Sequence, residues 1–506
     1  MFFTLLMTLC SVSFAAGRKA IVLYSFQAQG DGAIPAGGVI FDEAGNLYGA
    51  TQDGGTPGIG EVFQLKPPSR DGEPWTETIL HSFQSGGDGD IATSGVISDH
   101  GGNLYGVAEY GGTGKCEIAG QVVGCGVAYE LSPPATKGSA WTETVIYSFQ
   151  GGNDGDFPFG NLVHDKEGNL YGTTEYGGGS PDCSPAGPSC GTVFELSPPK
   201  TKGDPWTEKV LYSFQGGTDG GYPNGQLVLD ESGALYGTTY AGGNQGCSGF
   251  GMVGCGTAFE LKPPVRQGGV WTEKILHRFN GGKIDGGNPW AGLIFDRNGN
   301  LYGTTANYGS GSFGTVFQLI PPVEGNDSKS GHWTEKLIHT FIGSVDGTNP
   351  EASLTVDAKG NLYGVACCGG NPEYGTVFQL KPPAENHKTW LFTVLYSFKG
   401  SPDGASPASG LIFDYAGNLY STTLLGGTGT ECDFGGISGC GTVFRLGMNE
   451  RQHADITKRR AGRARASRIW RAVLAGPPNL NLQTVRQSAP LTLLLGWGTP
   501  KSKPNG

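Results

Sequence analysis

Seven aspartates, each followed directly by glycine, recur along the chain. They are Asp31, Asp88, Asp154, Asp219, Asp285, Asp346 and Asp403. Carboxylates gathered on one face of a rigid scaffold could bind a cation, the hydroxyl groups of a sugar or a basic partner. The alternative is a repeated Asp-Gly turn that serves the fold itself. The sequence favours the turn, and keeps the seven aspartates as candidate ligand-binding residues with calcium as the one cofactor left open.

Trp290 is a further candidate because it breaks the pattern of the sequence. It has no repeated counterpart and stands five residues after Asp285, in a segment that we expect to be a loop. A tryptophan ring in a loop could contact a ligand through its apolar face. Packing of the ring within its own loop is the alternative.

No set of residues points to catalysis. The eight histidines are scattered, and three of them, His81, His277 and His339, stand where other copies of the same segment have tyrosine. The chain contains no Gly-x-Ser-x-Gly or His-Glu-x-x-His motif. We therefore predict no catalytic residues and no metal ligands, and we lean towards a protein that is not an enzyme.

Eight of the 11 cysteines form four pairs with short spacing. The pairs are Cys116/Cys125, Cys183/Cys190, Cys247/Cys255 and Cys432/Cys440. Each pair stands in a long segment that we expect to be irregular, so a disulfide within the segment is the simplest connectivity. A metal site is disfavoured because no Cys-x-x-Cys or nearby histidine accompanies a pair. Cys367 and Cys368 are adjacent, and the sequence leaves open a disulfide between them, two free thiols or another partner.

Internal repeats show which elements position these residues. Gly-Asn-Leu-Tyr-Gly and its variants occur seven times, with the tyrosines 57 to 66 residues apart. Variants of Gly-Thr-Val-Phe-x-Leu also occur seven times, and variants of Trp-Thr-Glu-Lys, each beginning with tryptophan, occur six times. Helical periodicity is absent, and the apolar runs are short and bounded by Gly, Pro, Asn and Asp.

Each repeat is interpreted as four short strands, A to D, which predicts an all-β, seven-bladed β-propeller over residues 17–446. Strand D is missing after the seventh repeat, whereas a lone copy, Ala20–Phe26, precedes the first. We expect this N-terminal strand to complete the last blade and close the ring. The D–A and B–C connections of a propeller share one face, here called the loop face, so the seven Asp-Gly turns and the four cysteine segments should lie together.

A second aspartate series precedes strand B. Its members, each three residues before a glycine, are Asp42, Asp99, Asp165, Asp230, Asp296, Asp357 and Asp414. An aspartate can accept a hydrogen bond from the backbone two residues on, and glycine suits the left-handed position of a short hairpin turn. We interpret this series as structural.

The seven Gly-Asn-Leu-Tyr-Gly and Gly-Thr-Val-Phe-x-Leu copies resemble the GloVer tandem repeats of bacterial extracellular "choice-of-anchor" proteins, over residues 20–446. The segment Pro-x-Gly-x-x-x-Asp-x-x-Gly-Asn-Leu-Tyr also looks like the start of an NHL-type propeller blade. The resemblance implies an exported protein whose family has no assigned biochemical activity. The C-terminus departs from it, without a Pro-Glu-Pro sorting signal or a clear membrane anchor, so secretion is favoured over surface anchoring.

The two ends differ from the repeats. Residues 1–16 are a short apolar run that ends in small residues, which predicts a signal peptide. Residues 447–506 hold 11 basic and two acidic side chains, whereas the preceding 446 residues hold 23 and 43. We interpret residues 447–506 as a disordered basic tail without a membrane span, and the acidic charge of the body disfavours nucleic acid.

These observations predict an exported, non-catalytic propeller that acts as a binding or structural scaffold at or outside the bacterial cell surface. We expect a monomer, with an unknown protein or glycan as its partner. The alternative is an extracellular propeller enzyme, a hydrolase or lyase acting on polysaccharide, with the Asp-Gly loops supplying its carboxylates.

Overall fold

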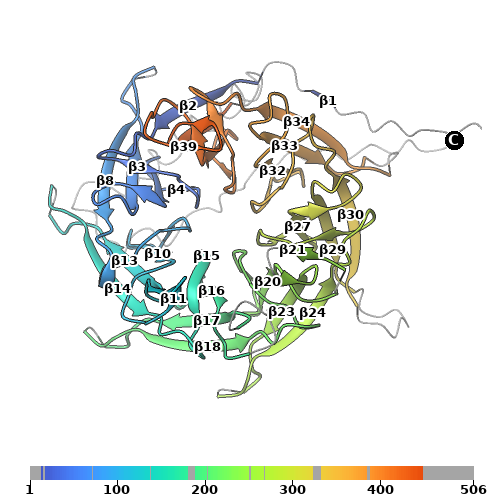
Figure 1. Ribbon diagram of the computed structural model, residues 1–506, viewed down its shortest axis with the longest axis horizontal. Helices are drawn as coiled ribbons and strands as arrows, with labels where there is room; N and C mark the ends of the chain where they lie inside the picture. Colours follow the sequence, from blue (N-terminus) through green and yellow to red (C-terminus); the bar gives the residue numbers. More distant parts are fainter. Residues whose placement is uncertain are drawn as a thin grey trace, which may run out of the picture. The chain divides into compact units, whose positions relative to one another are not determined.

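The computed structural model describes residues 13–14, 18–70, 72–136, 138–180, 189–201, 203–244, 246–249, 252–266, 268–322, 332–384 and 388–447. Within them, seven antiparallel blades of four strands each stand in a ring, and the sheet of blade 6 carries one further, parallel strand (Figure 1). The fold is therefore all-β and a seven-bladed propeller, as predicted. The only helical element of these residues is the 3₁₀ turn η1 (Gly86–Asp88). The described part of the chain has no helix that is long and apolar enough to span a membrane.

The strands of each blade follow the predicted order from the channel outwards. The inner A strands are β4 (Val39–Phe41), β9 (Ile97–Ser98), β15 (Asp156–His164), β19 (Val228–Leu229), β26 (Ile294–Phe295), β31 (Thr355–Val356) and β36 (Ile412–Phe413). The B strands are β5 (Leu47–Thr51), β10 (Leu104–Ala108), β16 (Leu170–Tyr176), β20 (Leu235–Thr239), β27 (Leu301–Thr305), β32 (Leu362–Ala366) and β37 (Leu419–Thr423).

The outer half of each blade holds strands C and D. The C strands are β7 (Glu61–Lys66), β13 (Val127–Ser132), β17 (Thr192–Ser197), β23 (Thr257–Lys262), β29 (Thr315–Ile320), β33 (Thr376–Lys381) and β41 (Thr442–Leu446). The D strands of blades 1 to 6 are β8 (Thr76–Ser82), β14 (Thr142–Ser148), β18 (Thr207–Ser213), β24 (Thr272–Arg278), β30 (Thr334–Thr340) and β34 (Leu391–Ser397).

The N-terminal strand β2 (Ala20–Ser25) closes the ring. It pairs with β41 from Ala20 opposite Leu446 to Ser25 opposite Thr442, and so becomes strand D of blade 7. Earlier in the chain, β1 (Ser13–Phe14) pairs in parallel with β34. The rest of the predicted signal peptide and, apart from Gly447, the predicted tail lie outside the described residues, so both stay predictions.

Aromatic side chains tie each blade to the next. The phenylalanine that follows each D strand packs edge-on against the aromatic ring of the next blade's C strand, with ring centroids 5.0–5.3 Å apart. Phe26 and Phe63 make this contact between blades 7 and 1. The tryptophan of the Trp-Thr-Glu segment also packs between blades, as Trp141 does on Tyr48 of blade 1.

The Asp42 series forms the A–B turns as predicted, and it explains the Gly-Asn-Leu-Tyr motif. Asp42 accepts hydrogen bonds from the backbone N–H groups of Ala44 and Asn46 at 2.9 and 2.8 Å. Its other oxygen accepts from the Asn46 side chain and from the Tyr48 hydroxyl. Asparagine and tyrosine therefore recur in the motif because both bind the turn aspartate.

Candidate functional site

The Asp-Gly turns lie on the loop face, where D–A and B–C connections pair with each other. In blade 1, β3 (Gly32–Ala33) pairs with β6 (Asp53–Gly54). Blades 5 and 7 repeat this with β25 (Gly286–Gly287) and β28 (Asn307–Tyr308), and with β35 (Gly404–Ala405) and β38 (Leu425–Gly426). The prediction that both kinds of connection share one face is confirmed.

Each Asp-Gly aspartate is already engaged by the protein. Asp154 accepts hydrogen bonds from the Tyr147 hydroxyl and from the backbone N–H of Gln150, both at 2.6 Å. The same two kinds of donor, a tyrosine or histidine of strand D and a backbone N–H three residues later, serve all seven. These contacts favour the structural interpretation of the series. Ligand binding by these residues stays a prediction.

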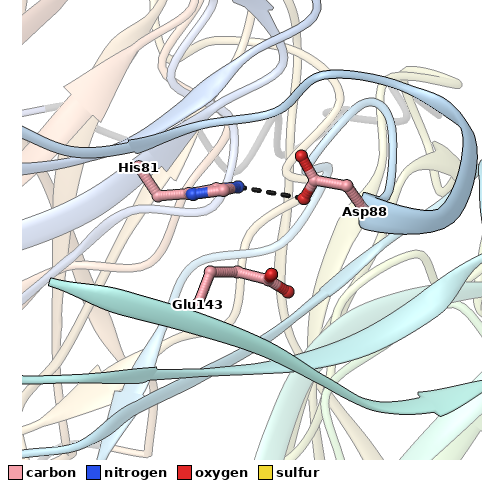
Figure 2. A group of neighbouring side chains, drawn as sticks. All are labelled: His81, Asp88 and Glu143. Atoms are coloured by element: carbon pink, nitrogen blue, oxygen red, sulfur yellow. Dashed lines mark hydrogen bonds and ion pairs between the residues drawn. The ribbon is translucent and has the colours of Figure 1, made fainter.

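A glutamate of the next blade joins five of these aspartates. It is the glutamate of the Trp-Thr-Glu segment, and one oxygen of its carboxylate is buried without a hydrogen-bond partner among the described residues. The five residues are Glu77, Glu143, Glu208, Glu273 and Glu335. Burial and the neighbouring aspartate raise the pKa of Glu208 and of Glu273 to about 7. Each junction between blades is here called a seam. Figure 2 shows the seam of blades 1 and 2, with His81, Asp88 and Glu143.

The central channel holds a cavity of about 540 Å³ that all seven blades line. One equivalent position per blade, before strand A in six blades and within β15 in blade 3, contributes a side chain that varies between blades. These residues are Ala36, Thr93, Phe159, Asn224, Trp290, Glu351 and Ala408. Because the surrounding blades repeat, variable positions such as this one distinguish one side of the cavity from another.

Two polar side chains of the cavity are buried with incomplete hydrogen bonding. Asn224 is 3% exposed, and its amide makes no well-aligned hydrogen bond among the described residues, although it lies near enough to Glu175 to lower the pKa of that carboxyl. The hydroxyl of Thr93 is buried and unpaired within that set. Native proteins pair nearly all buried polar groups, so both side chains are available for a bound molecule or water.

Carboxyl groups stand at and beside the cavity. Glu351 is the only ionisable residue of the lining, and burial raises its pKa to about 7. Glu175, at the end of strand B in blade 3, has its pKa raised to about 7 by burial and by the charge of Glu109, with a smaller opposing effect of Asn224. Glu109 occupies the same position in blade 2, and burial raises its pKa as well.

Trp290 lines the cavity and is also packed. Its ring lies edge-on to Phe159 and Tyr240, with centroids 5.8 and 5.3 Å away. Half-buried in this way, the indole is held rigidly while part of it faces the cavity. Packing of the ring, one of the two interpretations of Trp290, is thus observed, whereas contact with a ligand stays a prediction.

The predicted disulfides form wherever both cysteines are described. Cys116–Cys125, Cys247–Cys255 and Cys432–Cys440 are bonded. Cys190 is also in a disulfide, and its predicted partner Cys183 lies outside the described residues. The expectation that these segments are irregular is wrong in three blades, because β11 (Glu117–Ile118) with β12 (Gln121–Val122), β21 (Ser248–Gly249) with β22 (Met252–Val253), and β39 (Asp433–Phe434) with β40 (Ile437–Ser438) form hairpins there.

The second cysteine of each pair occupies a position that all seven blades use. Its carbonyl accepts a hydrogen bond from the next blade, as Cys125 does from the N–H of Phe157. The three blades with short loops have Ile59, Phe313 and Tyr374 in this place, with the same backbone bond. The disulfide of the cysteine-containing blades therefore occupies the position that a bulky side chain occupies in the other three blades. Cys367 and Cys368, by contrast, are free thiols with their sulfur atoms 2.7 Å apart.

A family model for the Gloeobacter/Verrucomicrobia repeat matches residues 8–250, 118–322 and 247–462, which spans the propeller. The chain belongs to the Gloeobacter/Verrucomicrobia repeat family. A search of curated protein sequences found no match.

Solved structures similar to this Gloeobacter/Verrucomicrobia repeat protein share low identity. Luciferin-regenerating enzyme is 14% identical, with 70% of this chain and 91% of that chain covered and a TM-score of 0.38. Pseudomonas fluorescens PhoX, in complex with vanadate, is 11% identical, with 88% and 97% covered and a TM-score of 0.39. Likeness at this level carries no argument about function.

Sequence reasoning missed the most distinctive residues of the cavity. Asn224, Glu351 and Thr93 received no role, whereas Trp290 did. The sequence did carry a signal, because this one position varies between Ala, Thr, Phe, Asn, Trp and Glu while the flanking segments repeat. Aligning the D–A connections would have exposed it.

Proposed function

We propose that this exported propeller is a non-catalytic binding protein, and that it takes a neutral, hydroxyl-rich ligand of the saccharide type in the cavity at the loop-face mouth of the channel. The observation that carries the proposal is the buried amide of Asn224 in the cavity lining, which has Glu175 beside it and makes no well-aligned hydrogen bond among the described residues. An amide oxygen and nitrogen together can accept from one hydroxyl and donate to another.

The rest of the lining supports a neutral ligand. No lysine or arginine is among the lining residues, so a phosphate, sulfate or carboxylate would find no countercharge. Glu351, with its pKa raised to about 7, can be an acceptor or a donor near neutral pH. Trp290 adds an aromatic surface for the apolar face of a sugar ring. Ligand pockets typically combine such apolar surface with a few convergent polar groups.

The test is a glycan array with the full chain, followed by titration calorimetry of the best ligand. Asn224→Ala and Trp290→Ala should each weaken binding about 10-fold or more, as expected for losing a buried hydrogen bond or an aromatic contact. Both variants should fold, because blades 1 and 7 have Ala36 and Ala408 at the same position. Tyr415→Ala, which removes an exposed aromatic ring from the opposite face, is the matched control.

Two results would contradict the proposal. One is saccharide binding that the two cavity variants leave unchanged, since the site would then lie elsewhere. The other is binding of amines in place of saccharides, which would assign a cationic ligand to Glu351.

A polysaccharide enzyme is the second candidate, and the observation that favours it is the pair Glu109 and Glu175. Both have raised pKa values, and the charge of one acts on the other. A carboxyl group that stays protonated near neutral pH can act as a general acid. Release of reducing sugar by the full chain, abolished in Glu175→Gln, would establish hydrolysis and overturn the non-catalytic proposal.

Export is part of the proposal. The family match and the disulfides support it, because disulfides persist in oxidising compartments. Mass analysis of the protein recovered from the medium of a bacterial host should show an N-terminus near residue 17.

A further inference from the structure

We propose that the seam between blades 1 and 2 binds a divalent transition-metal ion through His81, Asp88 and Glu143. Each residue offers one ligand atom, and these atoms all lie within 4.8 Å of one another. His81 comes from β8, Asp88 from η1 and Glu143 from β14, so the site joins the outer strands of two blades (Figure 2). This site is separate from the channel cavity, and the proposal does not depend on the proposed function.

Comparison with the neighbouring seam shows what histidine changes. Between blades 7 and 1, the hydroxyl of Tyr24 lies 2.9 Å from both Asp31 and Glu77, so one group engages both carboxylates. At the seam of blades 1 and 2, His81 replaces this hydroxyl. Its Nε2 lies 3.0 Å from Asp88, and Glu143 Oε1 remains buried without a hydrogen-bond partner among the described residues.

The donor set suits a metal of intermediate softness. Imidazole nitrogen and carboxylate oxygen are both ligand types that zinc accepts, and three protein ligands leave a fourth position for water. Nε2 would lose any proton it carries when the ion binds, so binding releases a proton at acidic pH. Within the described residues no lysine or arginine forms an ion pair with Asp88 or Glu143, and His81 is the one basic side chain paired with Asp88. A divalent ion would therefore add positive charge beside two carboxylates.

One carboxylate ligand is already oriented. The second oxygen of Asp88 accepts a hydrogen bond from the backbone N–H of Gln84 at 2.8 Å, which directs the first oxygen towards His81. Hydrogen bonds of this kind hold ligands in position around protein-bound metals.

The two other histidine seams lack a complete set. His277 lies 3.4 Å from Asp285, and with Glu335 it does not bring three ligand atoms within 4.8 Å. At the seam of blades 5 and 6, Phe392 takes the place of the glutamate and stacks on His339 at a centroid distance of 3.8 Å. The chain therefore offers internal controls.

The experiment is calorimetric titration of the metal-free full chain with Zn²⁺, comparing the wild type with His81→Tyr. The variant recreates the tyrosine seams of the same molecule, so it should stay folded, with its melting temperature checked before titration. We expect one zinc per wild-type chain. The zinc affinity of the variant should be on the order of 100-fold lower, because loss of a ligand should weaken binding at least as much as loss of a residue that only supports a ligand.

Three further variants keep the result decisive. His277→Tyr and the double variant Cys367→Ser/Cys368→Ser should retain the zinc, because neither touches the proposed ligands. Glu143→Gln should lose it if His81→Tyr happens not to fold. Cobalt substituted at the site should give a d–d absorption band that disappears with Glu143→Gln.

Absence of saturable zinc binding in the wild type would overturn the proposal. So would binding that survives His81→Tyr or Glu143→Gln in a folded protein, or binding abolished by the Cys367/Cys368 double variant. None of these outcomes affects saccharide binding in the channel, so the two proposals fail independently.

Discussion

At the scale of single residues, the seams place carboxyl groups close together with few donors. Tyr147, Asp154 and Glu208 form one such group. The tyrosine hydroxyl donates to Asp154, whereas Glu208 has one buried oxygen without a hydrogen-bond partner among the described residues. The like charge and the partial burial both disfavour a second ionised carboxylate. Glu208 is therefore held largely protonated at a pH where an exposed glutamate would be ionised.

Glu208 should make folding stability fall with rising pH. Its pKa is about 7 in the fold and about 4.3 in an unfolded chain. Between these values the folded state binds more protons, so the stabilising contribution is complete below about pH 4 and is lost as pH rises through 7. Glu208→Gln cannot ionise, so in urea unfolding at pH 5 and pH 8 the wild type should lose more stability than the variant. Equal losses would contradict the shifted pKa.

The glycine of the Leu-Tyr-Gly segment is a second residue-scale feature. A Cβ at Gly303 would lie 2.5 Å from the ring of Phe317 and 2.9 Å from Leu293. Gly303→Ala should therefore cost about 1–3 kcal/mol by overpacking, measured by chemical unfolding. Blade 7 has Ser421 at this position, with its hydroxyl bonded to the Ser409 and Gly410 carbonyls. Ser421→Gly is the matched control, and it should not raise the free energy of unfolding, because blade 7 already accommodates a Cβ at this position.

At the scale of elements, the disulfide hairpins replace a bulky side chain at the start of strand C. Cys255 is fully buried and its carbonyl accepts a hydrogen bond from Asn288 of the next blade. The disulfide thus anchors a hairpin on the loop face and also fills a position of the core between blades.

Removing one disulfide should cost stability without opening the ring. Cys247 and Cys255 are 8 residues apart, and their disulfide restricts the unfolded chain. The double variant Cys247→Ala/Cys255→Ala removes this restriction, so its free energy of unfolding should be about 2–3 kcal/mol lower. Chemical unfolding measures the loss, and near-ultraviolet circular dichroism should keep its native form. A collapse of that spectrum would show that the hairpin organises the blade.

At the scale of the whole molecule, closure by β2 joins the first and last blades. Besides its strand pairing, it places Phe26 on Phe63 of blade 1, and so completes a ring of seven aromatic contacts. Without β2, blade 7 would expose the edge of β41 and blade 1 would lose a buried neighbour.

Deletion of residues 18–26 should destabilise the protein by more than the about 3–5 kcal/mol expected from removing Phe26 alone. Thermal unfolding of the shortened chain measures the loss, and a synthetic peptide with the sequence of residues 18–26 should restore part of it. A shortened chain as stable as the full one would contradict closure by this strand.

Repetition made much of the fold predictable. Six copies of Gly-Asn-Leu-Tyr, one Gly-Ala-Leu-Tyr variant and a displaced Ala20–Phe26 segment were enough to predict strand order, blade number and closure. Each blade is built from local turns and short strands, so its pattern is visible in one stretch of sequence. Cysteine spacing predicted the disulfides for the same reason, since both partners lie in one connection.

The sequence by itself determined the blade, and the tertiary structure decided the sites. Closure of the ring brings seven positions, about 60 residues apart along the chain, around one cavity where Asn224 and Trp290 differ from their counterparts. Packing of blade against blade likewise brings Glu143 to His81. These contacts join residues of different repeats. The sequence pattern of one repeat shows which residues differ from their counterparts, but only the closed ring shows which of those residues come into contact.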